Sequence, residues 1–290
     1  MENKEHGLKR HLKARHIRLM ALGSTIGVGL FLGSATAIQI AGPAILLAYL
    51  LAGMVAFVVL RTLGEMAVHE PVAGSFASYA SSYINPLAGY MVGWGYWTYW
   101  VVVAIAEVTA VGIYMGMWFP DIPQWIWALL SIILMGLINL IAVKVFGEFE
   151  FWFALIKIVA IVLMIAMGSA VIFLGFTNDW VPMGLSNLWQ HGGFFPNGLS
   201  GFLLSLHMVL FAYVGIEMIG LSAGEAQNPK KTIPMAIDSL TWRILIFYLG
   251  ALLVILAIFP WNEVGQQGSP FVAMFERIGL REAAGVINFV

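Results

Sequence analysis

Long apolar segments recur along almost the whole chain, and they limit its possible folds more than any other feature. An α-helix needs about 20 apolar residues to cross the hydrocarbon core of a bilayer. Seven segments of about that length or longer cover residues 17–40, 43–67, 86–118, 124–143, 150–175, 199–222 and 236–260. An eighth begins near Ala283 and stops at Val290. The sequence therefore predicts an all-α integral membrane protein with seven complete transmembrane helices and the start of an eighth.

The composition agrees with this class. The chain is 61% hydrophobic and 10% charged, with a mean hydropathy of +0.90, whereas soluble domains carry about 25% charged residues. It has no cysteine, which excludes disulfides, thiolate metal sites and thiol nucleophiles. No His, Asp and Glu set has metal-ligand spacing, and Gly27-Val28-Gly29 lacks the spacing of a dinucleotide fingerprint. We therefore expect no enzyme activity, metal or other cofactor.

Basic residues are distributed unevenly among the connections, and cytoplasmic loops are the ones enriched in lysine and arginine. One side of the membrane would hold Lys4, Lys9, Arg10, Lys13, Arg15, Arg18, Arg61, Lys144, Lys230, Lys231 and Arg243. The opposite side would hold Arg277 and Arg281. This asymmetry predicts a cytoplasmic N-terminal tail at residues 1–16. It explains the basic start more simply than a nucleic-acid or lipid-headgroup patch does.

Glycines interrupt the first apolar segment near its middle. Gly23, Gly27 and Gly29 fall within seven residues, and each costs a helix roughly 1 kcal/mol relative to alanine. In lipid, a broken backbone is tolerated only where protein buries it or where it lines a cavity. Such a break predicts a binding site, although small residues also allow close helix packing.

The sixth segment repeats this pattern, because residues 211–220 contain Gly215, Gly220 and the carboxylate of Glu217. Segments one and six are five apart, so a second unit of five helices would enter the membrane from the opposite side. Discontinuous helices that meet near the midplane are typical of inverted repeats in transporters. We therefore predict a single membrane domain over residues 1–290, with a first repeat at 17–175 and an incomplete second repeat at 199–290.

Three charged residues lie deep inside predicted spans: Glu107, Lys157 and Glu217. A charge at the bilayer centre costs about 2.5–3.5 kcal/mol on insertion scales and usually faces a cavity or a partner. Lys157 has only apolar neighbours in sequence, so it could exchange a proton or extend its amine to the membrane surface. For the two glutamates, the other interpretation is a structural hydrogen bond to a neighbouring helix. The aromatic run at residues 94–100 is typical of an interfacial belt, and one of its faces could also line a cavity.

Several motifs together resemble those of bacterial amino acid permeases of the amino acid–polyamine–organocation superfamily, with the proline, histidine and aromatic amino acid permeases as the nearest members. The matching stretches are residues 15–17, 23–31, 41–43, 63–66, 146–153, Lys157, 223–229, 260–262 and 268–271. The resemblance covers essentially the whole chain. It implies the LeuT-type fold, which has two inverted five-helix repeats and two further helices. Because twelve helices are implied, we expect these 290 residues to be an N-terminal fragment or a natural truncation.

The resemblance also implies roles for individual residues. The backbone at Thr25, Gly27, Val28 and Gly29 would bind the substrate carboxylate. The backbone at Phe211, Tyr213 and Val214 would receive the amino group, with the Phe211 ring as a gate. Tyr96 and Glu217 resemble an outer-gate pair, and Lys157 matches a proton-coupling lysine. The substrate side chain would meet Tyr99, Trp100, Ala104 and Glu107. Val28 has no hydroxyl, so backbone binding must suffice at that position.

These implications describe a secondary active transporter that imports an amino acid with a proton across the cytoplasmic (inner) membrane by alternating access. Its partners would be the amino acid, the proton and membrane lipid, without nucleic acid. An amino acid exchanger is the nearest alternative. A channel would need a continuous polar stripe or charged rings, and a membrane enzyme would need a clustered catalytic set. The sequence leaves open which amino acid is carried, whether transport is symport or exchange, and the oligomeric state.

Overall fold

The structure, a computed structural model, describes residues 23, 25–72, 74–141, 143–176, 183–221, 223, 228–266, 269–277, 279 and 285. All regular secondary structure within these residues is helical, in agreement with the predicted class. The helices are α2 (Val28–Phe31), α3 (Gly33–Ala41), the 3-10 turn η1 (Gly42–Ala44), α4 (Ile45–His69), α5 (Ser75–Tyr83), α6 (Pro86–Gly116), α7 (Gln124–Ile141), α8 (Val143–Leu174), α9 (Asn187–Gln190), α10 (Gly198–Phe211), α11 (Met218–Leu221), α12 (Pro229–Ile258) and α13 (Pro270–Arg277).

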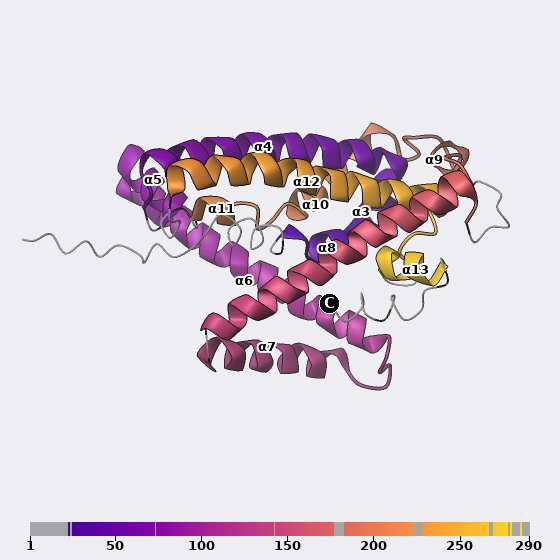
Figure 1. The fold of residues 1–290 in the computed structure, drawn as a ribbon, viewed down its shortest axis with the longest axis horizontal. Helices are drawn as coiled ribbons and strands as arrows, with labels where there is room; N and C mark the ends of the chain where they lie inside the picture. The colour runs from indigo at the N-terminus through magenta and orange to yellow at the C-terminus, as the bar shows by residue number, and fades with distance from the viewer. Residues whose placement is uncertain are drawn as a thin grey trace, which may run out of the picture.

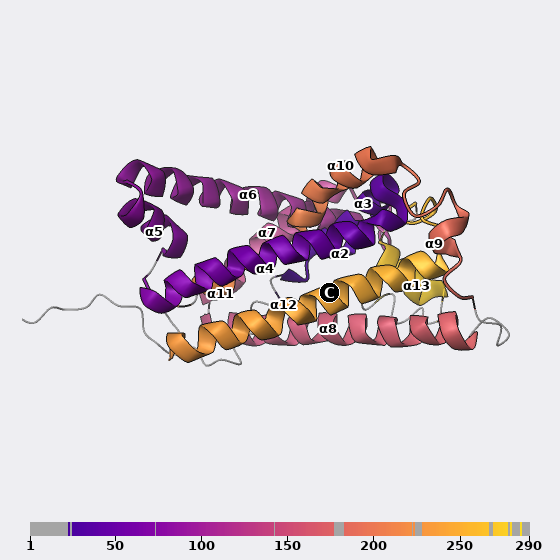
Figure 2. The same cartoon turned by 90° about the horizontal axis from the view of Figure 1, so that it is seen from above.

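Two long antiparallel helices, α4 and α12, lie side by side along the length of the molecule, at the top of the view in Figure 1 and across the middle in Figure 2. Helix α8 packs against α12, and α10 packs against α3 and α4. Helix α6 contacts α2, α5 and α7. The buried core draws mainly on α3, α4, α8, α12 and α13, and Tyr49 and Tyr248 are its largest fully buried side chains. This arrangement places the ends of α2 and α10 inside the packed helices.

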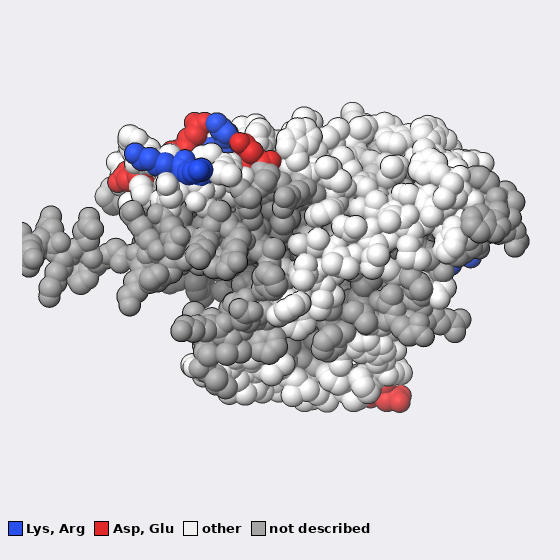
Figure 3. Space-filling view, viewed as in Figure 1, with Lys and Arg blue, Asp and Glu red and all other residues white. Residues whose placement is uncertain are grey.

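The outer surface is apolar over most of its area. Large apolar side chains on α6 and α7 are exposed, including Trp97 at 60% and Leu140 at 85%. In the space-filling view most of the described surface is uncharged, and charged side chains gather mainly at one end (Figure 3). A contiguous apolar surface of this extent would associate in water, so it is suited to contact with lipid.

Three stretches in the described part of the chain are long and apolar enough to cross a membrane, namely Gly33–His69, Pro86–Gly116 and Trp152–Leu174. Shorter apolar helices occupy parts of the other predicted segments, at Gln124–Ile138, Gly198–Phe211 and Ile244–Ile258. The membrane class is therefore confirmed at the level of long apolar helices. The number of seven spans, the LeuT-type arrangement and the division at residues 175 and 199 stay predictions.

A sharp turn separates the first two predicted spans. Gly42 has a φ of +63° at the end of α3, a conformation that favours glycine, and Pro43 follows in η1. A side chain at Gly42 would collide with Pro196 from the loop before α10. The glycine therefore allows both the turn and the close approach of that loop.

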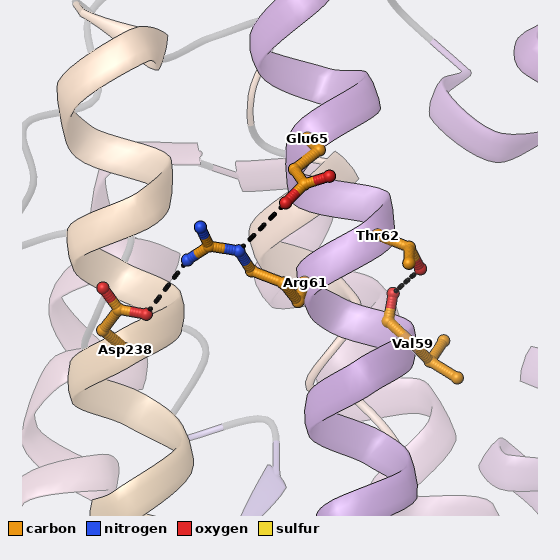
Figure 4. A network of polar contacts seen from close by, with 5 residues as sticks. All are labelled: Val59, Arg61, Thr62, Glu65 and Asp238. Atoms are coloured by element: carbon orange, nitrogen blue, oxygen red, sulfur yellow. Dashed lines mark hydrogen bonds and ion pairs between the residues drawn. The ribbon is translucent and has the colours of Figure 1, made fainter.

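Charged residues link α4 and α12 at one end (Figure 4). The Arg61 guanidinium lies 3.2 Å from a Glu65 carboxylate oxygen and 3.4 Å from an Asp238 carboxylate oxygen. All three side chains are largely exposed, and a cavity of about 150 Å³ lies beside them. The network lies at the end of α4 near His69, at a distance along the helix from the interruptions described below.

Candidate functional site

The predicted interruption in the first apolar segment is confirmed at Ile26 and Gly27, where the backbone is not helical. Gly27 is extended, with a φ of −131° and a ψ of −158°, and α2 begins at the next residue. The Gly27 amide donates a hydrogen bond to the Thr25 carbonyl at 3.0 Å. We call residues 25–29 the first break.

The second interruption is also confirmed. Helix α10 ends at Phe211, residues 212–217 form turns, and α11 begins at Met218. Gly215 has a φ of +93°, which a residue with a side chain rarely adopts. The Gly215 amide donates to Glu217 Oε2 at 2.9 Å, so the carboxylate stabilises this turn. We call residues 211–217 the second break.

The two breaks touch each other at Gly29. A Cβ atom at this position would lie 2.8 Å from the Ala212 Cα and 3.2 Å from the Phe211 carbonyl oxygen. Real Cβ atoms essentially never lie 2.8 Å from a backbone carbon, so only glycine fits at position 29. The sequence predicted that both segments break, and the structure adds that the breaks are in direct contact.

A buried tyrosine joins the two breaks. Tyr248, from α12, is fully buried, and its hydroxyl lies 2.8 Å from the Thr25 carbonyl oxygen and 2.7 Å from the Ala212 carbonyl oxygen. A hydroxyl has one proton to donate, so it is shared between one carbonyl from each break. Tyr213 packs on the Tyr248 ring at 5.2 Å and donates its hydroxyl to the Tyr49 carbonyl at 2.7 Å.

Sequence reasoning missed Tyr248. The available signal was a phenolic hydroxyl near the middle of the apolar stretch 244–258, where it must find a hydrogen-bond partner in the protein.

A carboxylate of the chain lies at the start of α2. The Val28 amide donates to Glu107 Oε1 over a long distance of 3.4 Å, and a Cβ at Gly27 would lie 3.0 Å from the same oxygen. Glu107 projects from α6 and is exposed. Peptide amides at the start of a helix favour a negative charge. The first break therefore meets a carboxylate at one of the amides that the sequence assigned to the substrate carboxylate.

Tyr96 and Glu217 lie in contact, although 121 positions separate them in the chain. The Tyr96 hydroxyl donates to Glu217 Oε1 at 3.2 Å. The Tyr99 ring stacks on Tyr96 at 5.8 Å with an interplanar angle of 19°, and Trp100 meets both rings edge-on. The structure thus brings three of the predicted aromatic residues together beside the second break. Trp94 and Trp97, also on α6, are exposed, as expected for a lipid-facing belt.

The remaining predicted residues lie on the helices around the breaks. Ala104 is exposed on α6, one turn before Glu107. Lys157 lies in α8, three residues after Ala154, whose Cβ is 2.8 Å from the position of a Cβ on Gly23. Lys157 therefore lies about one turn of α8 from the contact with Gly23. The described residues contain no group of three His, Asp or Glu side chains that could hold a metal ion.

Comparison with known proteins identifies the family. Residues 16–290 match the family described as amino acid permease. The chain belongs to the amino acid permease family.

Similar proteins from Bacillus subtilis (strain 168) match this permease chain over all or nearly all of its length. It is 61% identical over 290 residues to the uncharacterized amino acid permease YtnA, covering all of the chain and 63% of that protein. It is 54% identical over 290 residues to the probable threonine/serine transporter YbxG, covering all of the chain and 62% of YbxG. It is 51% identical over 283 residues to the amino-acid permease AapA, covering 98% of the chain and 61% of AapA. The chain therefore spans less than two thirds of the length of these relatives.

Proposed function

We propose that this permease chain forms the substrate-binding part of a secondary transporter that imports an amino acid together with a proton. The observation that carries the proposal is the contact between the two helix breaks at Gly29 and Tyr248. The first break presents amides at the start of a helix, and the second presents carbonyls at the end of α10. Peptide groups of opposite polarity, side by side, suit the two ends of a zwitterion.

In this proposal, the amides of the first break, at Thr25, Gly27, Val28 and Gly29, bind the carboxylate of the amino acid. The Glu107 carboxylate leaves the Val28 amide when the substrate arrives, because one N–H cannot serve two carboxylates. The backbone at Phe211, Tyr213 and Val214 receives the amino group. Tyr99, Trp100, Ala104 and Glu107 line the space for the substrate side chain.

Gating and coupling are assigned to the residues around these breaks. Tyr96 and Glu217 form the gate pair, and Phe211 is a second gate at the end of α10. The gate pair joins the second break to α6 and lies beside α5, which connects the second and third predicted spans. The predicted orientation would put this connection, and therefore the gate, on the cytoplasmic side. The resemblance implied an outer gate instead. Lys157 exchanges the coupling proton as the first segment moves. The protein lies in the cytoplasmic membrane with its N-terminus in the cytoplasm.

Uptake by the full-length protein in sealed vesicles tests the proposal. An imposed inward proton gradient should drive accumulation of a labelled amino acid, and a panel of twenty unlabelled amino acids, with threonine and serine among the first, should identify the competitors. Amidation of the competitor carboxylate or removal of its amino group should abolish competition. Counterflow without net proton movement would favour exchange. A folded protein that neither binds nor transports any amino acid would overturn the proposal.

A further inference from the structure

The short helix α5 is fixed between the end of α4 and the first half of α6 (Figures 1 and 2). On the α4 side, the Tyr79 hydroxyl donates to the Glu70 carbonyl at 2.7 Å, and the Tyr83 hydroxyl donates to Glu70 Oε2 at 3.1 Å. On the α6 side, a Cβ at Gly89 would lie 2.9 Å from the Ala77 carbonyl oxygen. Helix α5 is therefore bonded to the end of α4 and packed closely on α6.

One side chain of α5 reaches the gate pair. The Phe76 ring meets the Tyr96 ring edge-on, with ring centres 4.7 Å apart and an interplanar angle of 79°. Tyr96 in turn donates to Glu217 Oε1, and Glu217 Oε2 accepts from the Gly215 amide. A continuous series of contacts thus leads from α5 to the second break. Helix α5 also contacts α11, which begins directly after that break.

The backbone that leads into α5 is strained. Gly74 has a φ of +91°, and Ser75, which carries a side chain, has a φ of +43°. Ser75 is completely buried, and its hydroxyl has no hydrogen-bond partner among the described residues. A non-glycine residue in this conformation and a buried hydroxyl without a partner are both unfavourable. The contacts of α5 with α4 and α6 must therefore hold the helix in place against this strain.

We propose that Phe76 is a positioning residue for the gate pair and that α5 thereby closes the second break on its own side. Its ring restricts the rotation of Tyr96, so the Tyr96 hydroxyl stays on Glu217 and Glu217 stays on the Gly215 amide. When α5 withdraws, Tyr96 turns away and the turn at residues 212–217 becomes accessible. This inference rests on the proposed function only in treating Tyr96 and Glu217 as a gate.

Accessibility of a cysteine beside the gate tests the inference in the full-length protein. Residues 1–290 contain no cysteine, so M218C can act as a reporter, with the protein lacking this substitution as the labelling control. The Met218 sulfur lies 4.0 Å from the Tyr96 hydroxyl. Labelling by a membrane-impermeant maleimide is followed in vesicles of both orientations. F76A should raise the labelling rate about 3- to 10-fold, the factor expected for losing one edge-to-face ring contact.

Three further variants distinguish a specific role of the Phe76 ring from a general loss of packing around α5. F76Y keeps the ring and should label at the parental rate. I84A truncates an exposed side chain at the end of α5 and should also label at the parental rate. Y96F should raise the labelling rate by itself. Adding F76A to Y96F should raise it no further, because Y96F has already removed the hydroxyl that F76A would free.

Two outcomes would overturn the inference in a folded protein. One is an unchanged labelling rate in F76A, and the other is an equal rise in I84A. Labelling needs no substrate, so a protein that transports no amino acid but labels as expected would refute the proposed function alone.

Discussion

The two helix breaks differ in how the surrounding protein holds them. The first break is short and meets an exposed carboxylate over 3.4 Å, from Glu107 to the Val28 amide. In the second, residues 212–217 form turns, and the partly buried Glu217 accepts from the Gly215 amide at 2.9 Å. Tyr213, inside the second break, adds a hydrogen bond from a buried position to the Tyr49 carbonyl, whereas Tyr248 bonds one carbonyl of each break. The first break is therefore suited to exchanging its carboxylate, whereas the second is a turn held in place by side chains that would have to move to release it.

The largest expected effect comes from separating the breaks at Gly29. In G29A the new methyl group would meet the Ala212 backbone, which cannot move without shifting the second break. We expect uptake to be lost and stability to fall by about 1–3 kcal/mol, as for other overpacked positions. Uptake and thermal unfolding measure the two effects. G33A is the matched control, because the nearest atom to its new methyl group would be 3.7 Å away. Normal uptake in G29A would show that the breaks need not touch.

Removing the shared hydroxyl of Tyr248 should have the next largest effect. Y248F leaves the Thr25 and Ala212 carbonyls without this donor in a buried place, which costs about 1–3 kcal/mol. We expect a lower unfolding temperature and a reduced maximal uptake rate. Y90F, at an exposed tyrosine of α6, should match the parent in both measurements. A Y248F protein of parental stability would mean that other donors satisfy the two carbonyls.

The two glutamates offer a direct test of the difference between the breaks. E217A removes the acceptor of the Gly215 amide and of the Tyr96 hydroxyl, and should cost about 1–2 kcal/mol of unfolding free energy. E107A removes only the long contact at an exposed side chain, and should cost less than about 0.5 kcal/mol. Unfolding of both variants under one condition measures the difference. Equal losses of stability would show that Glu107 stabilises the first break as much as Glu217 stabilises the second.

The smallest effect is expected at the exposed charges that link α4 and α12. R61A removes the contacts with Glu65 and Asp238, and exposed ion pairs contribute about 0–1 kcal/mol. The loss of stability in R61A should become smaller still as salt is added, because salt screens exposed charges. Thermal unfolding at low and high salt measures it, and uptake should stay at the parental level. A large loss of uptake would extend the functional site to this end of the molecule.

The sequence determined where the long apolar helices lie and where two of the apolar segments break. Apolar length predicted the long helices at α4, α6 and α8, and glycines beside a carboxylate predicted the break at residues 212–217. Motifs predicted the family, and residues 16–290 match it. These features are local, because span length and the cost of glycine depend only on neighbouring residues.

Only the tertiary structure decided which side chains meet the breaks. Tyr248 reaches both breaks from α12, Phe76 reaches Tyr96 from α5, and Glu107 meets the Val28 amide from α6. A helix that is apolar on all sides has no sequence pattern that selects its inward face. Packing against neighbouring helices selects that face, so the residues around the breaks could be placed only once the helices were assembled.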